Sequence, residues 1–374
     1  MFFSLVRLVQ RTPWFDTFVS PYTWEIRIKL RTKQFLKVAR QVCPKRANAD
    51  EISKNEIREV LFLDNFPGYG DALYINGLLK VLRGNGINVH IATCPKLKTI
   101  YQTAVSTDAI YDITSEEDVE RIAKRDWDCA VNLSFFVERG WEKRLRILKN
   151  LKCRILDSDP LVAKDKSLNF EYLDVSSVSH IGDRWATVVK SLTGKSVARV
   201  SPYVGLKPVE SKENYVYINT VGSRWSRTIS QEQIGWIEEF LNTNKLIGYF
   251  YCKKENEIRV SEYVRRIDPE SFVAACRLIA GARGVITPDT SVVHVASAYS
   301  IPQLALFAGN CIAQYINRPM EDVFGPIGEF EILKPTRKEY FSKQVVPVSA
   351  VTKEELCAAL SRFLEKVNCS KEKT

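Results

Sequence analysis

Three small polar residues stand directly after an apolar, β-branched run in the second half of the chain. Residues 284–287 are typical of a buried strand, Pro288 ends that strand, and Asp289, Thr290 and Ser291 follow. All three residue types commonly cap helices, and the mostly apolar residues behind them fit a short buried helix. Free backbone N–H groups and the helix dipole point out of such a turn, which is where phosphate groups bind in α/β proteins. The segment therefore predicts a site for an anionic ligand.

A second polar loop, residues 222–230, follows the first predicted strand of the same half. It holds Arg224 and Arg227 on either side of Trp225. Guanidinium groups bind diphosphate in a forked geometry, so these arginines and the helix N-terminus would form one pyrophosphate site. His294, one turn into the helix, could add a donor. Alternatively, the arginines are surface charges and His294 is a packed core residue.

A third candidate lies in the first half, where a glycine-bearing turn, residues 65–70, follows an apolar strand. Gly68, Tyr69 and Gly70 would line the acceptor side of a cleft, because glycines let the backbone approach a ligand closely. Asp71 would lie in the first turn of the next helix, where a carboxylate can act as a general base or serve only the helix dipole. The turn does not match a dinucleotide fingerprint, and no acidic residue follows the second strand, which disfavours an NAD enzyme.

The elements that must position these residues alternate between apolar strands and amphipathic helices. Predicted strands of the first half are residues 59–64, 88–92, 109–113 and 127–133, and predicted helices are residues 71–83, 96–104, 115–124, 138–149 and 180–194. After a Pro-bearing linker the pattern restarts, with strands at 215–219, 246–251, 284–287 and 304–307 and helices at 231–242, 269–280 and 352–367.

This alternation predicts an α/β protein with two Rossmann-like, doubly wound parallel sheets facing a cleft. We expect an N-terminal extension over residues 1–56, an acceptor-binding domain over 57–200, a nucleotide-binding domain over 201–350, and a C-terminal helix and tail over 351–374. A chain of 374 residues with 45% hydrophobic and 26% charged residues is long enough for two cores.

The cysteine and histidine content argues against a disulfide framework and a zinc site. Nine cysteines are scattered singly without a CxxC pair, and the three histidines lie far apart. We expect reduced thiols, with Cys129 and Cys276 buried in apolar runs. The chain has no apolar stretch long enough for a transmembrane helix, and its N-terminus does not resemble a signal peptide.

The positive charge is concentrated at the N-terminus. Residues 1–50 carry ten basic and three acidic residues, which accounts for +7 of the net charge of +10. Aromatic residues are mixed with these charges, as suits an anionic membrane surface, whereas nucleic acid is the second possibility. The extension could also be a mostly helical, solvated segment packed on the body.

Residues 57–365 resemble glycosyltransferase family 9, the ADP-heptose:lipopolysaccharide heptosyltransferases. The resemblance rests on Gly70-Asp71, on His180-x-x-Asp-Arg-Trp185, on Arg227-x-Ile-Ser230, and on Asp289-Thr-Ser-x-x-His294 with the apolar strand that follows. Family members usually have glycine where Ser291 stands and often lysine where Arg227 stands. A serine can still offer its N–H to phosphate if its φ is negative.

The resemblance implies a GT-B fold and a metal-independent, inverting transfer. In this interpretation Asp71 is the general base, while Arg227 and the amides of Thr290 and Ser291 stabilise the departing ADP. Ser223 corresponds to a hydroxyl residue that contacts the diphosphate.

Further implied roles concern the sugar and the second substrate. Asp289 would hold the turn or meet the sugar hydroxyls, and Glu255 or Glu257 would contact sugar or ribose. The donor would be ADP-heptose, without a cofactor, and the acceptor would be Kdo–lipid A at the inner face of the inner membrane of a Gram-negative bacterium. That setting favours membrane over nucleic acid as the partner of the basic extension. A protein-glycosylating relative, another nucleotide sugar, an epimerase and an inactive binding module remain alternatives.

Overall fold

The computed structural model divides into two compact units between Gly205 and Leu206. It describes residues 36–37, 39, 57–64, 68–132, 141–157, 170–173, 178, 180–208, 213–254, 256–313, 318–335 and 345–369. Nearly all of the predicted N-terminal extension lies outside these ranges. We call the described residues up to Gly205 the first unit and those from Leu206 the second unit.

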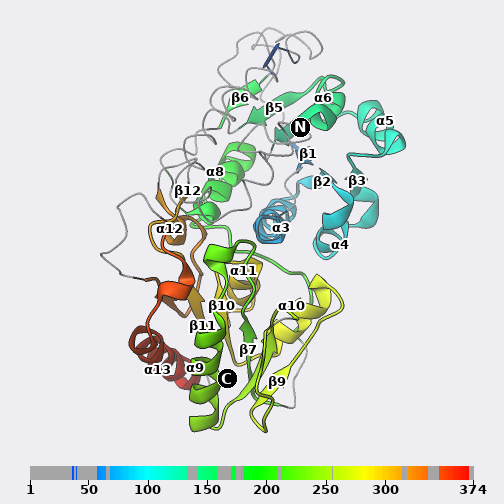
Figure 1. Ribbon diagram of the computed structural model, residues 1–374. Coiled ribbons are helices and arrows are strands. Elements are labelled where there is room, and N and C mark those ends of the chain that lie inside the picture. Colours follow the sequence, from blue (N-terminus) through cyan, green and yellow to red (C-terminus); the bar gives the residue numbers. More distant parts are fainter. Residues whose placement is uncertain are drawn as a thin grey trace, which may run out of the picture. The chain divides into compact units, whose positions relative to one another are not determined.

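The first unit is a six-stranded parallel sheet with strand order β3-β2-β1-β4-β5-β6 (Figure 1). Its strands are β1 (Glu59–Leu63), β2 (Asn88–Thr93), β3 (Ile110–Asp112), β4 (Cys129–Asn132), β5 (Arg154–Asp157) and β6 (Phe170–Tyr172). Its helices are α3 (Tyr69–Gly84), α4 (Lys98–Tyr101), α5 (Glu116–Lys124), α6 (Trp141–Leu148) and α8 (Ile181–Thr193). Helix α3 packs on α8, and α5 packs on α6. The strand order reverses at β1, so the carboxyl end of β1 lies at the switch point of the sheet.

The second unit repeats the same topology with strand order β14-β11-β10-β7-β8-β9. Its sheet contains β7 (Tyr215–Asn219), β8 (Ile247–Tyr251), β9 (Val264–Arg266), β10 (Gly284–Pro288), β11 (Gln303–Leu306) and β14 (Phe330–Leu333). Its helices are α9 (Gln231–Thr243), α10 (Phe272–Ala280), α11 (Ser291–Ala298), α12 (Met320–Phe324) and α13 (Lys353–Cys369). A small antiparallel pair joins β12 (Ile312–Ala313) to β13 (Arg318–Pro319).

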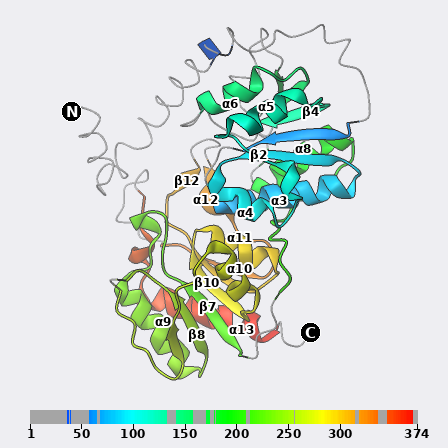
Figure 2. The same ribbon diagram turned by 90° about the vertical axis from the view of Figure 1, so that its right-hand side faces the viewer.

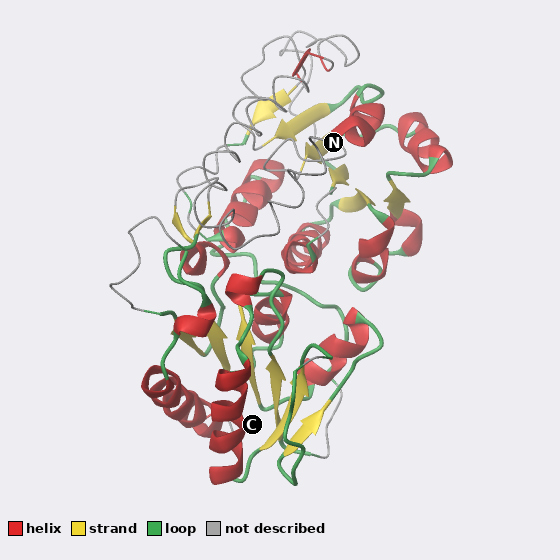
Figure 3. Ribbon diagram, in the orientation of Figure 1, coloured by secondary structure: helices red, strands yellow, loops and turns green. Residues whose placement is uncertain are grey.

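The helices of the second unit divide between the two faces of its sheet (Figures 2 and 3). Helix α9 packs on α13, and α10 packs on α11. The buried face of α13 recurs at helical spacing and joins the main core of this unit through Leu356, Ala359, Leu360, Phe363 and Val367. The prediction of two doubly wound α/β sheets is confirmed.

Two predicted helices are shorter in the structure than the sequence pattern indicated. The predicted helix over residues 96–104 is a 3₁₀ turn, Pro95–Leu97, followed by the single-turn helix α4. The predicted helix over 269–280 begins only at Phe272, because the Ser271 hydroxyl caps it by accepting from Ala274 N–H. The short strands β5, β6, β9 and β14 were not predicted; β6, β9 and β14 are edge strands.

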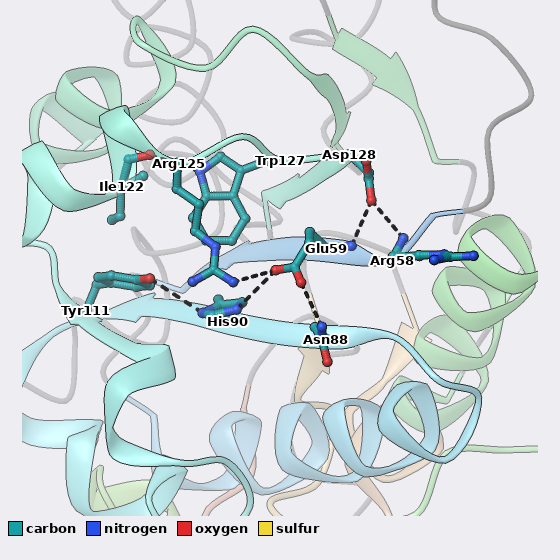
Figure 4. Close-up of polar contacts among 9 residues, drawn as sticks. All are labelled: Arg58, Glu59, Asn88, His90, Tyr111, Ile122, Arg125, Trp127 and Asp128. Atoms are coloured by element: carbon teal, nitrogen blue, oxygen red, sulfur yellow. Dashed lines mark hydrogen bonds and ion pairs between the residues drawn. The ribbon is translucent and has the colours of Figure 1, made fainter.

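A polar cluster ties together the amino ends of β1, β2 and β4 in the first unit (Figure 4). The Glu59 carboxylate accepts from Asn88 Nδ2 at 2.7 Å and from Arg125 at 2.7 Å, and His90 Nε2 lies 3.4 Å from it. Trp127 covers the His90 ring at 5.1 Å, edge to face. Burial, together with the Arg125 charge, lowers the pKa of His90. Burial opposes ionisation of Glu59, but the bonds from Asn88 and Arg125 outweigh it and lower the pKa of Glu59.

Within the described residues, no helix combines the length and the hydrophobicity needed to cross a bilayer. Cys129 and Cys276 are buried as predicted, at 0% and 1% exposure. Burial raises the pKa of the Cys276 thiol to about 12, which makes this thiol a poor nucleophile near neutral pH.

Candidate functional site

The predicted phosphate turn forms as expected between β10 and α11. Thr290 is the N-cap residue of α11 in extended backbone geometry, and its Oγ accepts from Val292 N–H at 3.3 Å. Asp289 N–H donates to Leu306 O in the neighbouring strand, which fixes the start of the turn. In the described part of the chain, the N–H groups of Thr290 and Ser291 have no hydrogen-bond acceptor. The positive end of the helix dipole lies at the same point, so the turn can hold an anion.

Ser291 occupies the position where the resemblance led us to expect glycine. It is the first residue of α11 and is not among the described residues with positive φ. A serine therefore fits here without backbone strain, and its N–H keeps the orientation that the helix gives it. The condition that the sequence placed on this residue is met, although phosphate binding itself stays a prediction.

The arginine loop, residues 222–230, follows β7 and is held in a tight 3₁₀ turn over Trp225–Arg227. Ile229 N–H donates to Thr220 O and closes the loop. A Cβ on Gly222 would lie 2.4 Å from the carbonyl oxygen of Arg227, so only glycine lets the two arms of the loop approach this closely.

The fold brings Arg227 and Asp289 together, because β7 and β10 are neighbours and their carboxyl ends carry the loop and the turn. Arg227 NH1 lies 3.0 Å from Asp289 Oδ2, with the two side chains 17% and 7% exposed. Burial raises the pKa of Asp289, and the positive charges of Arg227 and Arg224 oppose that rise. The two predicted arginines therefore act on one carboxylate at the edge of the phosphate turn.

The remaining predicted residues of the second unit differ in their placement. Ser223 and Arg224 are exposed on the arginine loop, and His294 is buried at 5% exposure. Glu255 lies outside the described residues. The neighbouring Glu257 has its backbone fixed by Gln231, whose side chain accepts from Glu257 N–H and donates to Glu257 O.

In the first unit, Asp71 lies in the first turn of α3, as the sequence predicted, and it is partly exposed. Gly68 is the N-cap residue of α3, and Tyr69 and Gly70 begin the helix. The Lys96 ammonium lies over the Tyr69 ring, 4.4 Å from its centre. Gly68 to Asp71 therefore stand at the carboxyl edge of the first sheet, where ligands of doubly wound folds bind.

A buried carboxylate that the sequence did not single out lies at the same edge. Asp64 directly follows β1, is 2% exposed, and accepts a hydrogen bond from the buried Tyr101 hydroxyl at 2.5 Å. Burial raises the pKa of Tyr101, and the negative charges of Asp64 and Asp71 raise it further. A polar residue at the end of an apolar strand is the signal that could have indicated Asp64.

The His180 motif serves the fold of the first unit. His180 is the N-cap residue of α8, and its Nδ1 accepts from Gly182 N–H at 3.0 Å. Asp183 accepts two bonds from the Arg199 guanidinium, at 2.6 and 2.7 Å. Trp185 is 3% exposed and belongs to the buried face of α8. These contacts explain the motif by helix capping and packing.

The described residues contain no group of three or more His, Cys, Asp or Glu side chains that could hold a metal ion.

The segment that contains the phosphate turn matches a known family of proteins. Residues 266–315 match the model of glycosyltransferase family 9 (heptosyltransferase). This range includes β10, Asp289, Thr290, Ser291 and His294. No curated protein matches the chain by sequence.

Solved structures share the fold over most of the chain. A family 9 glycosyl transferase from Veillonella parvula matches with a TM-score of 0.64 at 13% identity, covering 84% of this chain and 99% of that chain. The Escherichia coli heptosyltransferase WaaC with ADP matches with a TM-score of 0.59 at 12% identity, covering 83% of this chain and 99% of that chain. The E. coli ADP-heptose lps heptosyltransferase II matches with a TM-score of 0.58 at 12% identity, also covering 83% of this chain and 99% of that chain. The predicted GT-B fold and the predicted resemblance to family 9 are thus confirmed.

Proposed function

We propose that this family 9-like glycosyltransferase moves a heptosyl group from ADP-heptose to the Kdo–lipid A inner core of lipopolysaccharide. One observation carries the proposal: Arg227 and the N-terminal amides of α11 lie at one edge of the second sheet. Their chemistry fits a diphosphate, and the turn belongs to the segment that matches the family model. The similarity to a heptosyltransferase solved with ADP supports the choice of donor.

The second unit would bind the donor and stabilise the leaving group. As the bond between the sugar C1 and the diphosphate breaks, its electron pair passes to the β-phosphate oxygen. The guanidinium of Arg227 and the amides of Thr290 and Ser291 would receive this developing charge. A guanidinium has five N–H donors, so Arg227 can keep its bond to Asp289 while it binds phosphate oxygen. Ser223 and Arg224, exposed on the same loop, would add contacts to the diphosphate.

The first unit would bind the acceptor. Asp71 would take the proton from the acceptor hydroxyl while that oxygen attacks C1 from the face opposite to the departing ADP, which inverts the anomeric centre. General-base assistance of this kind contributes about 10²–10⁴-fold. The partial exposure of Asp71 and its place at the carboxyl edge support this role. Gly68 to Gly70 would leave room for the acceptor.

Three further parts of the proposed function concern metal, the sugar contacts and the membrane. We propose that the transfer needs no metal cofactor, that Glu255 or Glu257 contacts sugar or ribose, and that residues 1–56 attach the enzyme to the inner face of the inner membrane. The concentration of +7 charge in residues 1–50 supports the membrane contact, because a basic residue near an anionic surface contributes about 1 kcal/mol. A chain lacking residues 1–50 should lose binding to anionic liposomes, and undiminished binding would refute this part.

The test of the transfer is incubation with ADP-heptose and purified Kdo–lipid A, with and without EDTA, followed by mass spectrometry of the lipid. We expect the acceptor to gain the mass of one heptosyl group in both reactions. Asp71→Asn should bind ADP-heptose normally and lose transfer, whereas Asp126→Asn, at an exposed position of the same unit, should retain it. Normal transfer by Asp71→Asn would reject its role as the base.

The same assay separates the alternatives. An isomerised ADP-sugar without transfer would identify an epimerase. Binding of ADP-heptose with no turnover on any acceptor would identify a binding module. Transfer to a protein and not to Kdo–lipid A would identify a protein glycosyltransferase, and transfer from another nucleotide sugar would change the donor.

A further inference from the structure

Asn219 joins the arginine loop to the phosphate turn, and the mechanism above does not use it. It ends β7, is 3% exposed, and lies beside the end of β10. Its Nδ2 lies 3.2 Å from Val221 O, 3.1 Å from Thr287 Oγ and 3.1 Å from Thr290 Oγ. Its Oδ1 accepts from Val221 N–H at 3.1 Å. One amide side chain therefore contacts Val221, the residue before the arginine loop, and Thr290, the N-cap residue of α11.

The orientation of the Asn219 amide follows from its neighbours. Val221 N–H can only donate, so the atom that faces it must be the carbonyl oxygen Oδ1. Nδ2 then faces the two threonine hydroxyls, Thr287 and Thr290, and acts as their donor.

The positions of the hydroxyl protons follow from this orientation. Thr287 Oγ lies 2.9 Å from Pro288 O, a group that only accepts, so the Thr287 proton points there. Thr290 Oγ accepts from Val292 N–H and from Asn219 Nδ2, which occupies both of its lone pairs. The remaining proton of Thr290 can point to Thr287 Oγ at 3.1 Å or out of the turn toward a ligand.

We propose that Asn219 is a positioning residue that keeps the Thr290 hydroxyl a donor to the diphosphate, beside the two free amides of α11. By donating to Thr290 Oγ, Asn219 prevents that oxygen from accepting a bond from the ligand side. An anion placed at the turn then meets the Thr290 O–H and the amides of Thr290 and Ser291. The inference rests on the proposed function, because that function supplies the diphosphate.

The test is a double-mutant cycle on ADP affinity, measured by calorimetry with the full chain. Asn219→Ala should weaken ADP binding about 10-fold, as expected for a lost hydrogen bond to a charged ligand. Thr290→Val should weaken it at least as much. Because Asn219 acts through Thr290, the double variant should bind ADP at most about 2-fold more weakly than Thr290→Val does.

Asn219→Asp is a nearly isosteric variant that keeps the experiment decisive if Asn219→Ala does not fold. An ionised aspartate would accept the Thr290 proton and place a negative charge under the anion site, so we expect a loss of ADP affinity of about 100-fold. Asn244→Ala is the matched control, since Asn244 bonds Phe240 O at the exposed C-terminal end of α9. That control should bind ADP normally.

Two outcomes would overturn the role of Asn219. One is unchanged ADP affinity in Asn219→Asp, and the other is a double variant whose loss equals the product of the single losses. Absence of ADP binding by the wild-type chain would instead overturn the proposed function, so the two failures are distinguishable.

Discussion

Replacement of Arg227 by methionine should destabilise the second unit by an amount that depends strongly on pH. Methionine keeps the aliphatic stem and removes the charge that lies 3.0 Å from Asp289 Oδ2. Asp289 is then left as a carboxylate at 7% side-chain exposure without its ion-pair partner. The variant protein can avoid this cost only by binding a proton at Asp289.

The magnitude follows from the burial of the pair and from the cost of that proton. Removing one partner of a buried ion pair costs about 3–5 kcal/mol, and the 17% exposure of Arg227 favours the lower end. Protonating an aspartate with an ordinary pKa of 3.8 costs about 4.4 kcal/mol at pH 7 and about 1.6 kcal/mol at pH 5. Protonation therefore limits the loss at pH 5 but not at pH 7. We expect about 3 kcal/mol at pH 7 and no more than about 1.6 kcal/mol at pH 5.

The expected increase of the stability loss with pH agrees with the direction in which the pKa of Asp289 is shifted. A carboxyl group whose pKa is raised by folding loses its contribution to stability as the pH rises through the folded value. Burial already raises the pKa of Asp289 in the wild-type chain, and loss of Arg227 raises it further. The difference between variant and wild type must therefore grow with pH.

Urea unfolding at pH 5 and pH 7 measures this difference. Hydrogen exchange of peptides from β10 and β11 serves as the readout, so that the loss is assigned to the second unit. Arg277→Met, at an exposed position of α10, is the matched control. The double variant Arg227→Met, Asp289→Asn should show little dependence on pH, because it has no carboxylate to protonate. An equal loss at both pH values in Arg227→Met would refute the reasoning.

Three further changes test other parts of the structure. Gly222→Ala should weaken ADP binding about 10-fold by displacing the arginine loop, whereas Gly235→Ala, which meets nothing within 4 Å, should not change it; equal affinities in calorimetry would contradict the first expectation. Ser291→Gly should leave ADP affinity unchanged and cost about 0.5–1 kcal/mol in urea unfolding, since helical φ needs no glycine; tighter binding would show that serine hinders the site. The free energy of unfolding of the first unit should fall by at most about 2 kcal/mol between pH 6.5 and pH 5, because the lowered pKa of His90 makes the unfolded chain bind the proton more readily. Glu59 should add a loss only below its ordinary pKa of 4.5. His90→Asn should remove the pH dependence above pH 5, and pH dependence that persists in this variant would show that another group causes it.

The sequence predicted the elements of the fold better than their arrangement. Apolar runs such as residues 215–219 and 284–287 predicted buried parallel strands, and both form. Strand order is not contained in such runs, because periodicity reports which face of an element is buried and not which neighbour covers it. The short edge strand Val264–Arg266 buries only Val264 and carries too few apolar residues to be recognised.

The candidate site could be predicted by residue type and local position but not by contact. Capping residues after a strand predicted the turn at Thr290, and the structure confirms that turn. The ion pair between Arg227 and Asp289 joins residues that are 62 positions apart, and it depends on β7 lying next to β10. Asn219 gave only a weak signal, since one amide at the end of an apolar strand predicts no particular partner.

The repeated topology explains why the candidate site residues of the second unit lie close together. In both sheets the first strand lies in the middle, and the chain winds outward from it in two directions. In doubly wound sheets, the connections that leave the two central strands run in opposite directions, and ligands bind at the carboxyl edge where they separate. In the second unit these two loops are the arginine loop and the phosphate turn, so Asn219 and Asp289 become the residues that tie them together. The polar side chains of this edge therefore stabilise the fold before any ligand binds. For a substitution there, both the free energy of unfolding and the ligand affinity must be measured.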